Sequence, residues 1–329
     1  MRRVSIVLVV ALGVIAPAVA AAQDKLEVIV FPGGFNWPIW AAQDKGLFAR
    51  EGLEVRLTPT PSSMFQLKSL IEGKFDIGMT AIDNVVAYQE GQGEAEITVT
   101  PDLFAFMGGD RGGLRLMVQP DIHGYPDLKG KELSVDALTT GYAFVLRKVL
   151  ERGGLKDADY SLVRAGGTLQ RWEALKEGKH AGTLLTTPFD LLAEAAGFRR
   201  LANAADVLGA YQGLVGATRR SWAAANAAKL VGFVRGFRSG LDWLFDAANK
   251  PEAVAILQKN VRGMTADLGG KTYDVLLGPG GFTRTAAIDV EGVRTVLALR
   301  SQYARPQKSL RDPARYVDLT YYERAKEGR

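Results

Sequence analysis

One α/β unit occurs twice in this chain, and the repetition limits the fold more than any other feature of the sequence. A helix end, a glycine turn, a strand and small polar residues follow one another in residues 70–80 (LIEGKFDIGMT) and again in residues 175–187 (LKEGKHAGTLLTT). Each copy continues into a further helical pattern, over 81–90 and 188–196. Strands that alternate with helices predict parallel sheets with helical crossovers. The sequence therefore predicts an α/β protein with two lobes.

The other hydrophobic patterns extend this alternation over most of the chain. Short β-branched runs predict strands, and longer amphipathic runs predict helices. From Ser221 onward the pattern is mainly helical, and a stripe of large apolar residues between Leu230 and Phe245 is expected to be buried. The predicted strands are 26–31, 54–57, 75–79, 114–118, 132–135, 160–163 and 181–185, and the predicted helices are 37–50, 64–72, 142–151 and 169–176.

The composition leaves room for two domains and excludes several kinds of site. The 329 residues carry a formal net charge of 41 − 36 = +5, which falls to 39 − 36 = +3 without Arg2 and Arg3. A charge this small, without Lys/Arg blocks, argues against a nucleic-acid-binding surface. The absence of cysteine excludes disulfides, thiol nucleophiles and zinc–thiolate or iron–sulfur sites. Only His123 and His180 are present, so a metal cage built on histidine would need carboxylates as well. We expect neither a metal nor a cofactor.

The N-terminal residues have the three-part form of a secretory signal peptide. Arg2 and Arg3 precede an apolar run over 4–15, which is shorter than the roughly 20 residues that span a membrane. Small residues at 18–22 fit a cleavage site, so we expect residues 1–22 to be removed and the protein to be periplasmic. An uncleaved membrane anchor is the alternative. No cysteine follows the run, so no lipid anchor is expected.

Four segments resemble one protein family, and they occur in that family's order. They are residues 37–55 (WPIWAAQDKGLFAREGLEV), the turn and strand at 73–78, residues 127–135 (DLKGKELSV) and residues 175–190. In these segments the chain resembles the periplasmic solute-binding proteins of ABC importers, in the branch for sulfonates, nitrate, taurine and thiamine-type pyrimidines. The similarity extends over roughly residues 26–240.

The resemblance implies a type II periplasmic binding protein fold, with a hinge and a ligand cleft between two lobes. We expect residues 23–104 plus 210–329 to form lobe 1 and residues 105–209 to form lobe 2. The two crossing segments are expected near 103–107 and 209–213. The resemblance also implies a monomer that binds a small-molecule solute and delivers it to a membrane permease.

Candidate binding residues follow the predicted strands, because ligands of open α/β sheets bind at the carboxyl ends of the strands. Several of them have a purely structural alternative. Trp37 could pack in the core, and Arg171 could face solvent. One of Thr139 and Thr140, and also Asp190, could do no more than cap a helix. The candidates are Phe35, Asn36, Trp37, Thr80 and Asn84 in lobe 1, and Thr139, Thr140, Gly141, Tyr142, Thr168, Arg171, Thr187 and Asp190 in lobe 2.

This candidate lining contains more aromatic rings than charges, which argues against a small inorganic anion. We therefore expect a small organic solute with a planar or apolar body and an acidic or polar end. An aromatic carboxylate, a sulfonate and a pyrimidine all fit.

Two other functions stay open on the sequence. One is a ligand-sensing adaptor for a membrane receptor. The other is an exported enzyme related to the thiamine-pyrimidine synthase that resembles these binders, but that enzyme depends on a cysteine-rich motif, which this chain lacks. No nucleophile elbow or metalloprotease motif is present either, so we do not expect an enzyme.

Overall fold

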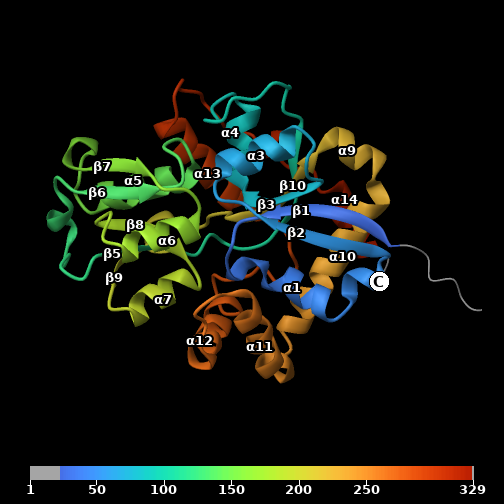
Figure 1. Cartoon of the computed structure of the whole chain (residues 1–329). Helices are drawn as coiled ribbons and strands as arrows, with labels where there is room; N and C mark the ends of the chain where they lie inside the picture. Colours follow the sequence, from blue (N-terminus) through green and yellow to red (C-terminus); the bar gives the residue numbers. More distant parts are fainter. Residues whose placement is uncertain (1–22, 328–329) are drawn as a thin grey trace, which may run out of the picture.

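A computed structural model describes residues 23–327 and contains two α/β lobes that lie side by side (Figure 1). The signal peptide expected over 1–22 lies outside the described residues. Within the described part, no helix is long and apolar enough to cross a membrane.

The first lobe is built on a five-stranded sheet of order β2-β1-β3-β10-β4. Strand β1 pairs in parallel with β2 and β3, whereas β10 pairs antiparallel with β3 and β4. The strands are β1 (Asp24–Val30), β2 (Leu53–Pro59), β3 (Ile77–Ala81), β4 (Leu103–Gly108) and β10 (Leu214–Arg219).

The second lobe repeats this plan with the order β7-β6-β8-β5-β9. Strand β6 is parallel to β7 and β8, and β5 runs antiparallel to β8. In each lobe, therefore, the strand that follows a crossing from the other lobe pairs antiparallel with one of the parallel strands. These strands are β10 in the first lobe and β5 in the second. The strands are β5 (Leu114–Val118), β6 (Glu132–Val135), β7 (Ser161–Arg164), β8 (Gly182–Thr186) and β9 (Arg199–Asn203).

The strands correct the sequence-based prediction in two respects. Both sheets are mixed and not purely parallel, and β4, β9 and β10 were not predicted as strands. The first crossing segment, expected near 103–107, is strand β4 itself, so the expected boundary after residue 104 falls inside a strand of the first sheet. The chain crosses between Gly108 and Leu114, and it returns between β9 and β10.

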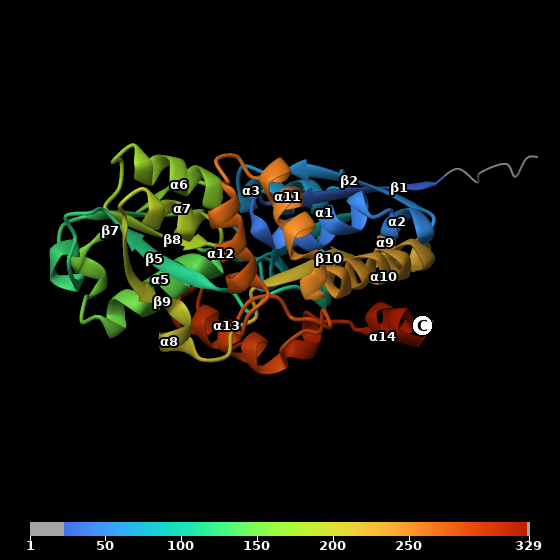
Figure 2. The ribbon, with the colours of Figure 1, turned by 90° about the horizontal axis from the view of Figure 1, so that it is seen from below.

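Helices cover both faces of each sheet, and two helices from the end of the chain lie between the lobes. In Figure 2 both α12 and α13 are seen there. The helix predicted over 37–50 is divided at Gly46, which has the left-handed φ of 64°. The first lobe carries α1 (Trp37–Asp44), α2 (Leu47–Arg50), α3 (Ser63–Ile71), α4 (Ile82–Gln89), α9 (Arg220–Ala225), α10 (Ala227–Leu244), α11 (Lys250–Asn260), α12 (Ala266–Leu276) and α14 (Thr320–Glu327); the second carries α5 (Gly141–Arg152), α6 (Thr168–Lys176), α7 (Phe189–Ala195) and α8 (Ala204–Leu208).

Helix α13 (Val290–Tyr303) packs against α4 of the first lobe and α5 of the second. Its Val293, Val296 and Leu297 belong to an apolar cluster that also contains Phe144 of α5. The Phe144 and Tyr303 rings stack at 6.0 Å between centroids. The C-terminal region therefore does not belong to the first lobe alone, because α13 completes the packing of the second.

Helix α10 fills the opposite side of the first lobe, where its apolar stripe packs against α1. Five residues of the predicted stripe, from Leu230 to Leu244, are fully buried, and Phe245 is half-buried. The helix axes approach so closely that a Cβ at Gly240 would lie 2.2 Å from the backbone oxygen of Pro38. Glycine is required there by contact with the neighbouring helix.

Gly240→Ala should therefore destabilise the protein by about 2 kcal/mol, because the new methyl group would push α10 away from α1. The control is Gly270→Ala in α12, where a Cβ would meet nothing within 4 Å. There the better helix propensity of alanine should stabilise by about 0.5–1 kcal/mol. Urea denaturation of both variants measures the difference, and equal effects at the two sites would contradict the packing argument.

Candidate functional site

The two crossing segments lie side by side and are hydrogen-bonded to each other. The Asp110 carboxylate accepts from the backbone N–H of Gly112 (2.7 Å) and of Leu214 (3.1 Å). A Cβ at Gly213 would lie 2.3 Å from Asp110 Oδ1 and 2.5 Å from Gly112 Cα, so a side chain would separate the segments. Only glycine permits this approach, which fixes the place where the lobes are joined.

A third segment, from the end of the chain, runs along the same junction. The N–H of Thr283 donates to Gly109 O (2.9 Å), and the N–H of Asp289 donates to the Gln212 side chain (2.7 Å). Three stretches of chain thus meet at the junction, although only two of them connect the sheets.

A cavity lies between the lobes next to this junction. Its empty volume is about 510 Å³, including its open mouth. This volume is typical of a small-molecule site. The lining comes from both lobes and consists of Phe31, Phe35, Ala81, Asn84, Asp110, Asp136, Thr140, Gly141, Tyr142, Gly167, Thr168, Arg171 and Leu214.

Arg171, from the first turn of α6, is the cation of this lining. It is only 2% exposed, and its guanidinium donates to Gly166 O (2.8 Å), Leu184 O (3.2 Å) and Thr168 Oγ1 (3.2 Å). Burial lowers its pKa, while the nearby Asp136 carboxylate raises it. Arg171 therefore holds the loop that precedes α6 against β8.

The other charged residues of the lining are two carboxylates, Asp110 and Asp136. Burial raises the pKa of both above the ordinary value. The Arg171 charge and the N–H of Ser63 oppose this shift at Asp136, and the N–H groups of Leu214 and Gly112 oppose it at Asp110. Among the described residues neither carboxylate forms an ion pair. The Arg171 charge acts on Asp136, and the Arg115 charge acts on Asp110, without direct contact.

Tyr142 provides the aromatic wall on the second lobe, opposite Phe31 and Phe35 of the first. Burial, and secondarily the Asp110 carboxylate, raise the pKa of its hydroxyl, so it stays protonated and can donate a hydrogen bond. Its ring lies 6.5 Å from the Tyr211 ring, centroid to centroid.

Direct hydrogen bonds cross between the lobes around the cavity. The Asp136 carboxylate accepts from Ser63 N at the start of α3 (3.0 and 3.2 Å), and Gly167 N donates to Pro61 O (2.7 Å). On another side, Glu94 accepts from Thr139 N (2.6 Å) and from Arg164 Nε (2.8 Å). These contacts describe a form in which the lobes are closed on each other.

A buried ion pair supports the same region from behind. Arg300 of α13 is fully buried and forms a two-pronged pair with Asp83 (2.7 and 2.5 Å). It also donates to Gln92 Oε1 (3.1 Å) and to Thr139 O (2.7 Å), and lies over the Phe144 ring. Arg300 thereby ties together the turns that carry Asn84 on one lobe and Thr140 on the other.

The structure brings seven of the predicted site residues to the cavity: Phe35, Asn84, Thr140, Gly141, Tyr142, Thr168 and Arg171. Arg171 faces inward, so the solvent-facing alternative is wrong. Thr80 and Thr139 lie behind the lining. Thr80 is buried and accepts a hydrogen bond from Asn84 (2.9 Å), and Thr139 forms the contacts between the lobes described above.

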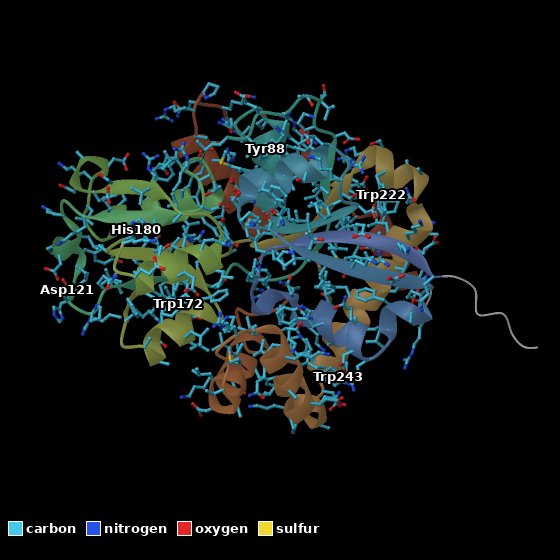
Figure 3. All side chains as sticks on the ribbon, viewed as in Figure 1. Tyr88, Asp121, Trp172, His180, Trp222 and Trp243 are labelled. Atoms are coloured by element: carbon cyan, nitrogen blue, oxygen red, sulfur yellow. The ribbon has the colours of Figure 1, made fainter. Side chains whose placement is uncertain are left out.

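Trp37 and Asn36 do not line this cavity. Trp37 is fully buried in the first lobe, and its indole N–H donates to Ala253 O (3.0 Å), so it is a core residue. The Asn36 amide donates to Phe31 O (2.6 Å). Asn36 instead borders an outer groove between the lobes, together with Trp172, which is labelled in Figure 3.

Thr187 and Asp190 belong to the surroundings of Arg115. Arg115 donates to Thr187 Oγ1 (3.0 Å) and forms an ion pair with the buried Asp190 (3.3 Å). Thr187 and Arg115 line a smaller neighbouring cavity of about 320 Å³, which shares Phe35 and Asp110 with the first. Asp190 therefore serves as the counter-ion of an arginine and not as a lining residue.

Both carboxylates of the cavity, Asp110 and Asp136, are absent from the residues predicted from the sequence. Asp136 directly follows the predicted strand at 132–135, so the rule that selected the other candidates also applies to it. Asp110 lies in a crossing segment that was expected a few residues earlier, and no local signal marks it. Among the described residues, no group of three His, Asp or Glu side chains could hold a metal.

The family model "NMT1/THI5 like" matches residues 36–254, more than half of the chain. The chain belongs to this family. Among curated protein sequences, none matches the chain.

Solved structures with the same fold cover nearly the whole chain. A protein from Bordetella bronchiseptica RB50 is 21% identical and has a TM-score of 0.75, with 94% of this chain and 98% of that one covered. The alkanesulfonate-binding protein SsuA from Xanthomonas axonopodis pv. citri, bound to MOPS, is 17% identical with a TM-score of 0.70 and coverages of 89% and 96%.

The periplasmic nitrate-binding protein NrtA from Synechocystis PCC 6803 is 14% identical, with a TM-score of 0.65 and coverages of 75% and 69%. These similarities confirm the predicted periplasmic binding protein fold with two α/β lobes.

The buried ion pair of Arg300 and Asp83 should be important for the stability of the fold. Asp83→Asn should cost about 3–5 kcal/mol, because it leaves the arginine charge buried without its counter-ion. Asp267→Asn is the control, since its pair with Lys271 is exposed and should contribute less than about 1 kcal/mol. Denaturant titration of both variants measures this, and a small loss for Asp83→Asn would mean that Gln92 and Thr139 suffice to hold Arg300.

Proposed function

We propose that this protein is the extracytoplasmic solute-binding component of an ABC importer. It captures a small organic solute between its lobes and delivers it to a membrane permease. The observation that carries this proposal is the cavity, which both lobes line and which lies beside their junction. The fold shared with the sulfonate- and nitrate-binding proteins supports it.

In this proposal the protein binds without chemistry. One lobe receives the solute, and rotation about the crossing segments brings the other lobe down. As the cleft closes, Ser63 N donates to the Asp136 carboxylate and Arg164 Nε donates to the Glu94 carboxylate. Removal of water from the closed cleft strengthens the polar contacts to the solute. A permease would then distinguish the closed form from the open one.

The lining favours an organic solute over an inorganic ion. Phe31, Phe35 and Tyr142 provide apolar area, while Asn84, Thr140 and Thr168 provide hydrogen-bonding groups. A planar or apolar body with a polar end matches this combination. We expect the protein to act as a periplasmic monomer after removal of residues 1–22.

A thermal-shift screen of residues 23–329 against organic acids, sulfonates, amines and pyrimidines tests the proposal. A solute that raises the melting temperature should also close the lobes on each other. Closure should decrease the radius of gyration of the protein or slow the hydrogen exchange of the backbone amides that bond across the lobes. Conversion of a solute into product during incubation would instead favour an enzyme.

Tyr142→Ala should weaken binding of such a solute by about tenfold or more, because it removes one aromatic wall and a hydroxyl group from the cavity. The melting temperature of the empty protein should change little. Tyr125→Ala, in the 3-10 turn η2 (Tyr125–Leu128) outside the cavity, is the matched control and should leave the affinity unchanged. Isothermal titration calorimetry gives both affinities, and equal losses would place the solute elsewhere.

A further inference from the structure

The cavity is lined by more negative than positive charge. Its lining contains one guanidinium, Arg171, and two carboxylates, Asp110 and Asp136, so its formal charge is 1 − 2 = −1. An anionic solute would meet more negative than positive charge there. The nitrate- and alkanesulfonate-binding proteins of the same fold are named for anions, so the charge balance points this chain to another solute class.

The single cation of the lining, Arg171, already donates hydrogen bonds within its own lobe. Within the described part of the chain, the guanidinium of Arg171 donates to two carbonyl groups and a hydroxyl group of the second lobe, at 2.8–3.2 Å. A guanidinium has five N–H donors and grips an anion best with two parallel ones. With its donors directed to Gly166, Leu184 and Thr168, Arg171 is poorly placed for a two-pronged contact with a solute.

The carboxylates, by contrast, keep unused acceptor capacity. Both backbone bonds to Asp110 reach the same oxygen, Oδ1, and within the described part of the chain Oδ2 receives none. Asp136 accepts hydrogen bonds from Ser63 alone among the described residues: its two oxygens share the backbone N–H, and the Ser63 side chain also lowers its pKa. Since a carboxylate offers about four acceptor positions, each side chain can accept further donors from a solute. Burial raises the pKa of both groups, and a cationic solute would offset this desolvation.

The aromatic residues suit the same kind of solute. Phe31, Phe35 and Tyr142 lie on opposite sides of the cavity, and ring faces attract cations as well as planar apolar groups. Rings combined with carboxylates are complementary to an organic group that is planar and positively charged.

We propose that the solute presents a positively charged, hydrogen-bond-donating nitrogen group, such as an amidinium or a protonated amine on a planar body, to Asp110 and Asp136. This inference rests on the proposed solute-binding function and replaces the acidic end by a basic one.

Benzamidine and benzoate test the inference because they have nearly the same shape and opposite charge. Calorimetric titration of residues 23–329 should show benzamidine binding at least tenfold more tightly than benzoate. Asp110→Asn and Asp136→Asn should each weaken benzamidine binding by about tenfold, because the amide that replaces the carboxylate lacks its charge. An asparagine oxygen can still accept from Gly112 and Leu214, so the junction is kept in Asp110→Asn.

Asp121→Asn is the control variant, since this exposed carboxylate lies at the outer end of the second lobe (Figure 3). It should bind benzamidine like the unchanged protein, and the melting temperature of each empty variant verifies folding. Benzoate that binds equally or more tightly overturns the inference but leaves the proposed function standing. Binding of neither probe overturns the inference, and the failure of every solute in the wider screen would overturn the proposed function with it.

Discussion

The close approach of the two crossing segments is the constraint on which the rest of the structure depends. Gly112 and Gly213 let the segments pass without side chains between them, and the Asp110 carboxylate bonds to both. This contact fixes the point about which one lobe can turn relative to the other. It also brings Asp110 to the inner end of the cavity, so one side chain belongs both to the junction and to the lining.

The lobes are joined by contacts of two chemical kinds. One apolar cluster continues from the first lobe through α13 to α5 of the second, whereas around the cavity the lobes meet through directional polar contacts such as Glu94 with Arg164 and Arg300 with Thr139. Hydrogen bonds of this kind can exchange with water at a modest net cost, whereas opening an apolar core is far more costly. The polar contacts around the cavity can therefore open more readily than the apolar packing of α13 against both lobes.

The sequence predicted local structure better than long-range arrangement. Strands β5 and β6 have the predicted bounds, because alternation and turn residues define them locally. Strand β4 was mistaken for a crossing, since its antiparallel partner β10 lies over one hundred residues away. The rule that binding residues follow the ends of strands predicted Thr140, Tyr142 and Arg171, which line the cavity. The same rule was wrong for Trp37, because packing decides which way a helical side chain points, and Trp37 points into the core.

The packing of α13 on α5 has a consequence for the order in which the protein folds. The second lobe is made from a continuous middle segment, yet Phe144 is covered by a helix that ends at Tyr303. A nascent polypeptide that has reached only β9 would leave this ring uncovered. We therefore expect the second lobe to complete its packing only after nearly the whole chain has left the ribosome, although its own sheet is continuous in the sequence.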